Sequence, residues 1–196
     1  MQDELTGILL SHAHYDHLDR PSLRLLGRDV TVVAPRGSRP LLRRFSDVRE
    51  LQVGQEVRFG GVAVTATTAE HTSRRVTMRS TESVGYVVSG SRSVYFAGDT
   101  DLFDGMADLA GSLDVALIPV AGWGSKVGVG HLDPERAARA VELLKPRVAV
   151  PIHWGTLSLV HKQTSSEPPE TFKRLAADLA PDVDVRIVAP GEELAL

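Results

Sequence analysis

Three features are missing from this chain, and each absence excludes a class of protein. Its 196 residues include no cysteine, which excludes disulfide bonds, thiolate nucleophiles and zinc sites with cysteine ligands. No apolar run reaches the roughly 18 residues that a transmembrane helix needs, and the start MQDELTG lacks the basic and apolar regions of a signal peptide. The formal net charge of -3 gives no broad positive field, so nucleic acid is not a favoured partner. We therefore expect a cytoplasmic protein without a transmembrane segment.

The composition is otherwise ordinary for a soluble globular protein. Hydrophobic residues make up 42% of the chain and charged residues 24%. The length suits one domain over residues 1–196, with enough chain to bury a full core.

Strand and helix patterns alternate along the chain. Branched apolar runs between turn residues predict strands over 6–10, 30–35, 114–120, 147–153 and 184–190, and a β-rich stretch over 48–98. Apolar spacing predicts helices over 21–27, 38–45, 134–144 and 169–179. The third helix is the best marked, because Asp133 suits its N-cap and Pro134 its first turn. Two β-rich halves, each with helices, predict an α/β protein, an αββα four-layer sandwich of two mixed β-sheets.

The stretch SHAHYDHLD, residues 11–19, holds three of the seven histidines and two aspartates. At the His and Asp frequencies of this chain, the pattern H-x-H-x-D-H would arise by chance roughly six times in ten thousand such sequences. It follows directly after the first predicted strand. The stretch therefore indicates a metal site rather than a random polar surface.

Histidine and aspartate also follow three other predicted strands. His71, Asp99 and His153 each come at or just after the end of a strand, as His12, His14, Asp16 and His17 do after the first one. A scaffold of this kind gathers residues that are distant in sequence into one cleft. We therefore expect these seven side chains to meet.

Five imidazoles and two carboxylates offer nitrogen and oxygen ligands. Such a set suits Zn(II), with Mn(II) or Fe(II) as alternatives, and zinc is our first choice. Seven ligands are too many for one tetrahedral ion but suit two ions about 3.5–4 Å apart. We assign His12, His14 and His71 to one ion, Asp16, His17 and His153 to the other, and Asp99 to a bridge between them.

The charge of such a site indicates the substrate. Two divalent ions, two carboxylates and a bridging hydroxide leave a net charge of about +1, which favours an anionic oxygen. The oxygen would belong to a phosphodiester or to a developing tetrahedral oxyanion. The hydroxide that bridges the ions would be the nucleophile.

The motifs HAHYDH, EH at 70–71, AGDT at 97–100 and PIHWGT at 151–156 resemble, in order, those of the metallo-β-lactamase-fold hydrolases. EHTSRR, YFAGDT, HLDPERA and IHWGT most resemble the branch of N-acylphosphatidylethanolamine phospholipase D-type and ascorbate-6-phosphate lactonase-like proteins. The resemblance implies a dinuclear hydrolase of phosphodiesters or phosphorylated lactones, with a small anionic or lipid-like substrate. The alternatives are a nuclease of the tRNA-processing type and a catalytically inactive binding module.

The resemblance also implies roles around the ions. His131 lies where related hydrolases have a histidine that holds a phosphate or protonates the leaving group, so we assign it, with Asp16, to catalysis. Arg74 and the adjacent Arg75 are candidate anion clamps, and Trp123 is a candidate pocket lid. The alternatives are a polar residue before a helix N-cap for His131, surface charge for the arginines, and packing for Trp123.

The chain departs from the family at its start. Family members have several dozen residues before the first histidine motif, and here the first strand begins within ten residues of Met1. We expect a first sheet without its usual opening strands and an unpaired edge on the first strand. Such an edge pairs readily with other chains, so we expect homo-oligomer formation or high mobility around residues 1–20.

Overall fold

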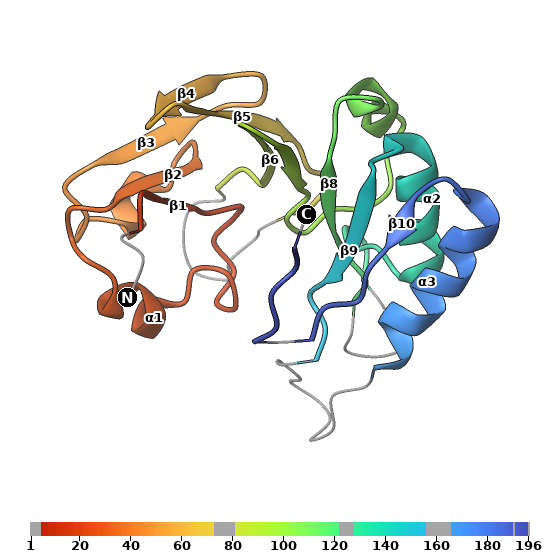
Figure 1. The fold of residues 1–196 in the computed structure, drawn as a ribbon. Helices are drawn as coiled ribbons and strands as arrows, with labels where there is room; N and C mark the ends of the chain where they lie inside the picture. The colour runs from red at the N-terminus through yellow and green to blue at the C-terminus, as the bar shows by residue number, and fades with distance from the viewer. Residues whose placement is uncertain (1–4, 73–80, 122–127, 156–165, 190, 196) are drawn as a thin grey trace.

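The computed structural model describes residues 5–72, 81–121, 128–155, 166–189 and 191–195 (Figure 1). Its strands are β1 Gly7–Leu9, β2 Thr31–Pro35, β3 Val48–Leu51, β4 Glu56–Phe59, β5 Val62–Thr68, β6 Val84–Ser89, β7 Ser93–Phe96, β8 Val115–Pro119, β9 Val148–Ile152 and β10 Asp184–Val185. Its helices are α1 Arg20–Leu25, α2 Pro134–Leu144 and α3 Glu167–Leu179, with short 3-10 helices η1 Arg39–Leu41 and η2 Asp104–Leu109.

The strands form two sheets, as the sequence predicts. The smaller sheet has the order β1-β2-β3, and its described strands are parallel. The larger sheet has the order β10-β9-β8-β7-β6-β5-β4 and is mixed, since pairing is antiparallel from β4 to β7 and parallel from β7 to β10. Within the described part of the chain, β1 is an edge strand, as expected.

Alternation along β2 shows how the small sheet is packed on both faces. Val32 and Ala34 belong to a cluster on the outer face, together with Leu23 of α1. Val33 points the other way and packs with Val64 and Tyr86 of the larger sheet. The two sheets are therefore stacked, with α1 on the free face of the smaller one.

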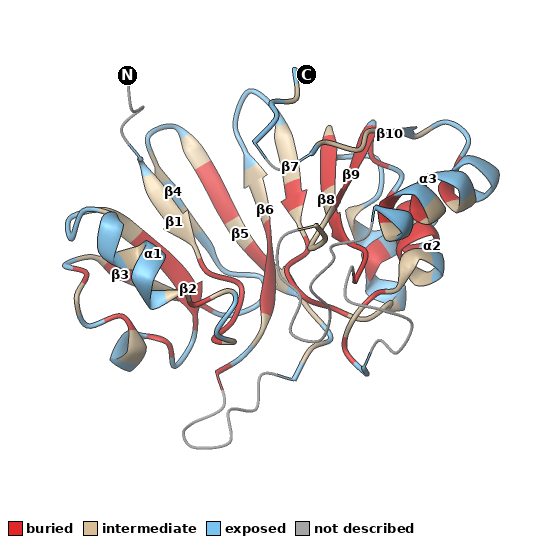
Figure 2. Cartoon of the chain, turned by 90° about the horizontal axis from the view of Figure 1, so that it is seen from below, coloured by how far each residue is buried: buried red, intermediate tan, exposed pale blue. Residues whose placement is uncertain are grey.

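Helices α2 and α3 cover the outer face of the larger sheet (Figures 1 and 2). Helix α2 has the predicted bounds, since the Asp133 carboxylate accepts a hydrogen bond from the Arg136 N–H and Pro134 opens the first turn. Its buried stripe consists of Ala137, Ala138, Ala140, Val141 and Leu144. The αββα order of layers thus follows from apolar faces that the sequence already carries.

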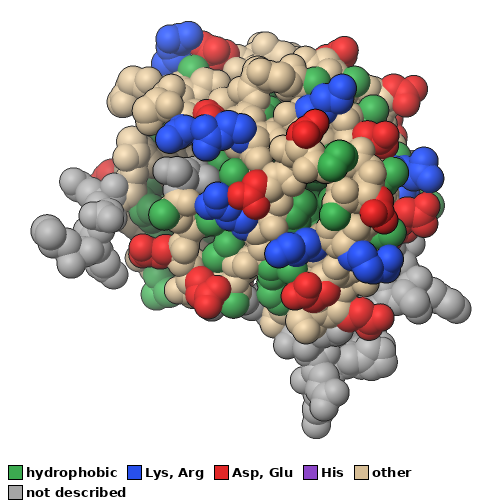
Figure 3. All heavy atoms as spheres, turned by 45° about the vertical axis from the view of Figure 1, so that its right-hand side comes forward, with side chains coloured by type: hydrophobic (Ala, Val, Ile, Leu, Met, Phe, Trp, Pro, Cys, Tyr) green, Lys and Arg blue, Asp and Glu red, His purple; other side chains and the backbone are tan. Residues whose placement is uncertain are grey.

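The other face of β8 and β9 is covered by the C-terminal segment. Val115, Val148 and Val150 pack there with Val188 and Leu194. Figure 3 turns the α2 and α3 side of the molecule forward, and acidic and basic side chains are interspersed over it. No described histidine is visible on that face.

Two predicted elements are much shorter than expected, while the ends of several others differ by one or two residues. The segment 38–45 forms only η1, because the chain then turns so that Leu42 and Phe45 enter the core and the Ser46 N–H donates to the Arg28 carbonyl at 3.0 Å. The strand predicted over 184–190 is only β10, since the chain beyond it leaves the sheet edge to pack on β8 and β9. Helix α1 ends before Gly27. Among the described residues, no helix is long and apolar enough to cross a membrane.

Candidate metal centre

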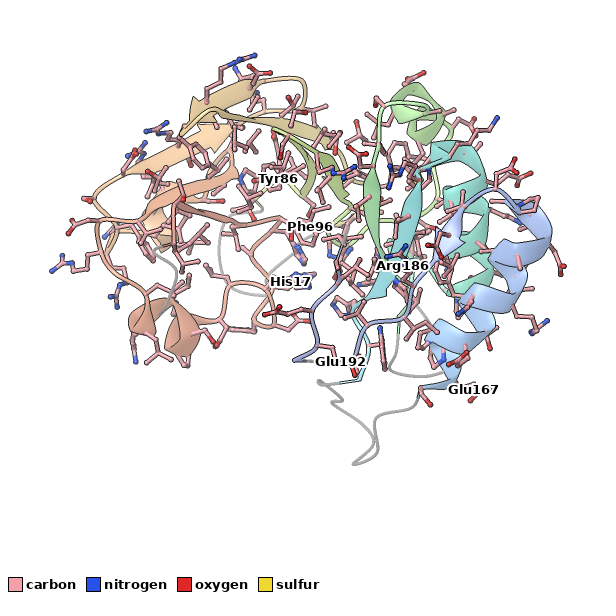
Figure 4. All side chains as sticks on the ribbon, viewed as in Figure 1. His17, Tyr86, Phe96, Glu167, Arg186 and Glu192 are labelled. Carbon is pink, nitrogen blue, oxygen red and sulfur yellow. The ribbon has the colours of Figure 1, made fainter. Side chains whose placement is uncertain are left out.

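The seven predicted ligands come from the ends of four strands. The loop after β1 carries His12, His14, Asp16 and His17; His71 follows β5, Asp99 follows β7 and His153 follows β9. In Figure 4, His17 lies between the half of the molecule that contains β1–β3 and the half that contains β8–β9. The structure brings all seven side chains together in two adjoining groups.

The first group consists of His12, His14, His71 and Asp99, each of which offers one ligand atom within 4.8 Å of the others. His14 Nδ1 lies 3.0 Å from His12 Nε2 and 3.1 Å from His71 Nε2. A metal–nitrogen distance of about 2.0–2.1 Å sets tetrahedral ligand atoms about 3.3–3.4 Å apart, so these nitrogens have nearly the spacing of ligands to one ion.

Hydrogen bonds on the outer ring nitrogens fix which atoms face the centre. His71 Nδ1 donates to the Gly130 carbonyl at 2.8 Å, which leaves a lone pair on Nε2. His12 Nδ1 lies 3.1 Å from the Ser11 hydroxyl. Imidazole nitrogens crowded together in this way repel one another unless a cation or a proton lies between them.

The second group consists of Asp16, His17 and His153. His17 Nε2 lies 3.1 Å from His153 Nε2, and Asp16 Oδ2 lies 3.6 Å from each of these nitrogens. His153 has a φ of 63°, in the left-handed region that a side chain rarely adopts. Strained backbone of this kind is concentrated at functional sites.

Asp99 lies between the two groups and is 4% exposed. Its Oδ2 is 3.7 Å from His12 Nε2 and 3.2 Å from His17 Nε2, and its Oδ1 is 3.4 Å from His153 Nε2. Oδ1 is buried and has no hydrogen-bond partner among the described residues. A buried carboxylate oxygen without a donor is costly unless a cation binds it, so the residues fit two divalent ions with Asp99 between them.

Close packing of Gly98 brings Asp99 to the histidines. Gly98 has a φ of +62°, and a Cβ there would lie 2.8 Å from Ser11 Cβ and 3.0 Å from the Val84 carbonyl oxygen. Only glycine lets the turn after β7 approach the loop after β1 this closely.

Burial lowers the pKa of three of the clustered histidines. Burial lowers the pKa of His12 to about 2, and it also lowers the pKa values of His14 and His71. These three rings are neutral near pH 7, the form that binds metal.

The pKa of His153 is raised, and the pKa values of Asp16 and Asp99 are lowered. Burial opposes the charged form of His153, but Asp16 and Asp99 outweigh it and raise its pKa. The hydrogen bond to His153 lowers the pKa of Asp16 to about 2. Burial alone would raise the pKa of Asp99, yet hydrogen bonds from His131 and His17 hold it well below its usual value. Both carboxylates are ionised and offer negative charge to the centre.

His131 lies at the edge of the first group. Its Nε2 is 3.5 Å from Asp99 Oδ2, and its ring centroid is 4.7 Å from that of His71. The contact with Asp99 raises the pKa of His131 above its ordinary value. Arg74, Arg75 and Trp123, the other predicted substrate contacts, lie outside the described residues.

Some supporting residues carried no sequence signal that singled them out. Ser11 faces His12, Gly130 accepts from His71, and Asp101 holds Gly130 through its N–H. Asp101 and Gly130 are 29 residues apart, so their contact can be seen only in the folded chain. A surface groove of about 1060 Å³, lined by Asp114, Lys145 and Pro181 among others, contains none of the predicted ligands.

Comparisons with known proteins agree with this geometry. The family model for the beta-lactamase superfamily domain matches residues 2–154. A UPF0173 metal-dependent hydrolase of Methanopyrus kandleri is 36% identical over 200 residues, which span 94% of this chain and 80% of that protein. One from Thermococcus kodakarensis is 33% identical over 204 residues, spanning 96% and 81%.

Among solved structures, Igni18, described as a novel metallo hydrolase from Ignicoccus hospitalis, superposes with a TM-score of 0.74 at 25% identity. The match covers 96% of this chain and 78% of that one.

Proposed function

The chain belongs to the UPF0173 metal-dependent hydrolases of the metallo-β-lactamase superfamily, and from this premise we propose a dinuclear site that hydrolyses a phosphodiester or a phosphorylated lactone. The observation that carries the proposal is the position of Asp99. Its Oδ2 lies 3.7 Å from His12 Nε2 in the first group and 3.2 Å from His17 Nε2 in the second. Its Oδ1 lies 3.4 Å from His153 Nε2 and has no hydrogen-bond donor among the described residues. That arrangement is what a bridge between two ions requires.

The seven clustered residues are our proposed ligands, and zinc is the proposed metal, with Mn and Fe as alternatives. Two bound ions would supply Lewis acidity and an acidified water as the nucleophile. Asp99 would hold the two ligand groups at a fixed separation. Asp16 would keep His17 and His153 oriented toward the centre, since its carboxylate lies between them.

His131 is our proposed general acid. It reaches the centre from the loop before α2, and the neighbouring Asp99 favours its protonated form. A protonated imidazole at the edge of the centre can give its proton to a leaving alkoxide. The same charge would attract an anionic substrate.

The substrate class rests on charge and on the motif resemblance. A site with net positive charge favours an anionic group. The resemblance to phospholipase D-type and lactonase-like proteins favours a small anionic or lipid-like substrate. Arg74 and Trp123 remain proposed substrate contacts. The cytoplasmic location, the single domain over 1–196 and self-association through the edge of β1 also remain proposals.

The test is metal-loaded hydrolysis of bis-p-nitrophenyl phosphate, with zinc, manganese and iron loaded separately and bound metal counted by mass spectrometry. We expect two ions per chain and turnover with at least one metal. Asp99→Ala should lose one ion and at least about 10–100-fold of the activity, because its carboxylate joins the two groups. Full metal content and full activity in that variant would remove the bridge from the proposal.

Two other results would favour the alternatives. Salt-sensitive RNA binding would support the nuclease. A correctly loaded protein without turnover on phosphodiesters or phosphorylated lactones would support the inactive binding module.

A further inference from the structure

Asp101, two residues beyond Asp99, joins the elements that surround His71. Its Oδ2 accepts a hydrogen bond from the Gly130 N–H at 3.1 Å, and its Oδ1 accepts from Arg136 Nη1 at 2.6 Å. Its own backbone N–H donates to the carbonyl of Glu70, the residue before His71, at 2.9 Å. Asp101 thus contacts Glu70, which precedes His71 in the chain, and Gly130, whose carbonyl contacts the His71 ring.

The Gly130 peptide group transmits this contact to the imidazole. While its N–H is held by Asp101, its carbonyl accepts the proton of His71 Nδ1 at 2.8 Å. Gly130 has a φ of +86°, and a Cβ there would lie 3.1 Å from His71 Nδ1. The glycine lets the carbonyl lie directly against the ring, and its orientation depends on Asp101.

Arg136 ties this arrangement to a rigid helix. It lies in the first turn of α2, where its backbone N–H and its Nε both bond Asp133, at 2.8 and 3.2 Å. The Arg136–Asp101 pair is partly shielded, with side chains 31% and 18% exposed. A charged hydrogen bond between partly buried groups is stronger and better oriented than an exposed one.

We propose that Asp101, held by Arg136, is a positioning residue that fixes the tautomer and the orientation of His71. The inference rests on the proposed function, in which His71 is a metal ligand. A proton held on Nδ1 leaves Nε2 as the ligand atom, and hydrogen bonds of this outer kind commonly set the affinity of a metal site. Asp101 is not among the clustered ligand residues, so its proposed role is exerted through Gly130.

Asp101→Asn is the direct test, because an amide has a single acceptor oxygen. Either Gly130 or the Arg136 and Leu102 donors must then face an NH₂ group. Asp114→Asn is the matched control, since Asp114 also accepts from a backbone N–H, that of Ser93 at 2.9 Å, and from an arginine, Arg92 at 3.4 Å, but it lies just before β8, at the end opposite the ligands.

Zinc and cobalt affinities of both variants are measured by competition with a chelator, together with urea unfolding of the metal-free proteins. We expect Asp101→Asn to bind metal about 10–100-fold more weakly, and Asp114→Asn to bind as the parent does. Arg136→Lys should retain more affinity than Arg136→Met, which tests the pair should Asp101→Asn fail to fold. Equal affinities in folded Asp101→Asn and the parent overturn the inference.

A second readout needs no metal. Long-range ¹⁵N spectra of the metal-free parent should show His71 protonated on Nδ1 with a slowly exchanging proton, and Asp101→Asn should lose that protection. Loss of protection supports the positioning role whether or not the parent binds metal. A parent that binds no ion contradicts the proposed function but leaves the positioning role intact. Unchanged protection and tautomer overturn the positioning role and leave the proposed function standing.

Discussion

Replacing Gly98 by alanine tests whether close packing between two loops builds the metal centre. The new Cβ would lie 2.8 Å from Ser11 Cβ and 3.0 Å from the Val84 carbonyl oxygen. Neither neighbour is the end of a flexible side chain, and the Val84 N–H also donates to the Ser11 carbonyl at 3.0 Å. The overlap must therefore separate the loop before His12 from the turn that carries Asp99.

Gly111→Ala separates the cost of that overlap from the cost of backbone strain. Gly111 has a φ of +78°, close to the +62° of Gly98, but a Cβ there meets nothing within 4 Å. Each alanine should cost about 1–2 kcal/mol for the left-handed conformation, offset in both by about 0.4–1 kcal/mol from the stiffer unfolded chain. Only Gly98→Ala should add about 1–3 kcal/mol for overpacking.

Urea unfolding of the metal-free variants measures this difference, and metal titration measures its consequence. We expect Gly98→Ala to be less stable than Gly111→Ala by the overpacking energy and to bind metal more weakly, because Asp99 is displaced from the histidines. Gly111→Ala should bind metal as the parent does. Equal stabilities together with equal affinities would refute the view that the Gly98 contact positions Asp99.

Two further predictions concern protons. If His131 is the general acid, His131→Ala should slow hydrolysis of esters with poor alkoxide leaving groups far more than that of p-nitrophenyl esters, which leave without protonation; equal losses would indicate binding or stability instead. For the metal-free protein, burial lowers the pKa of His12 from 6.5 to about 2, so in this window the unfolded chain binds a proton that the folded chain excludes. His12 should therefore contribute a fall of up to about 1.4 kcal/mol per pH unit in the free energy of unfolding as the pH drops, and a His12→Asn variant with the same slope as the parent would contradict this account.

Local signals in the sequence were enough for the elements that depend on local chemistry. Helix α2 has its predicted bounds because Asp133, Pro134 and an apolar stripe act within one helix. The clustering of the seven residues followed from their positions at strand ends, since those ends meet at one edge of the packed sheets.

Contacts between distant segments left no such signal. In the sequence AGDTD, nothing distinguishes Asp101 from an ordinary acidic residue of a turn. Only the folded chain brings its carboxylate to Gly130 and Arg136. The helix predicted over 38–45 is too long for the same reason. Tertiary burial of Leu42 and Phe45 outweighs the helical propensity of this segment.

The origin of the ligands links the site to the stacking of the sheets. The loop after β1, from the smaller sheet, supplies His12, His14, Asp16 and His17, while the larger sheet supplies His71, Asp99 and His153. Each proposed ion would therefore take ligands from both sheets, which also meet through apolar packing and through hydrogen bonds such as that from the Tyr86 hydroxyl to the Leu10 carbonyl at 2.8 Å. Because such a site exists only when the sheets are packed, the free energy of metal binding would add to the stability of the fold. A substitution that loosens the contact between the sheets should consequently weaken metal binding without touching any ligand.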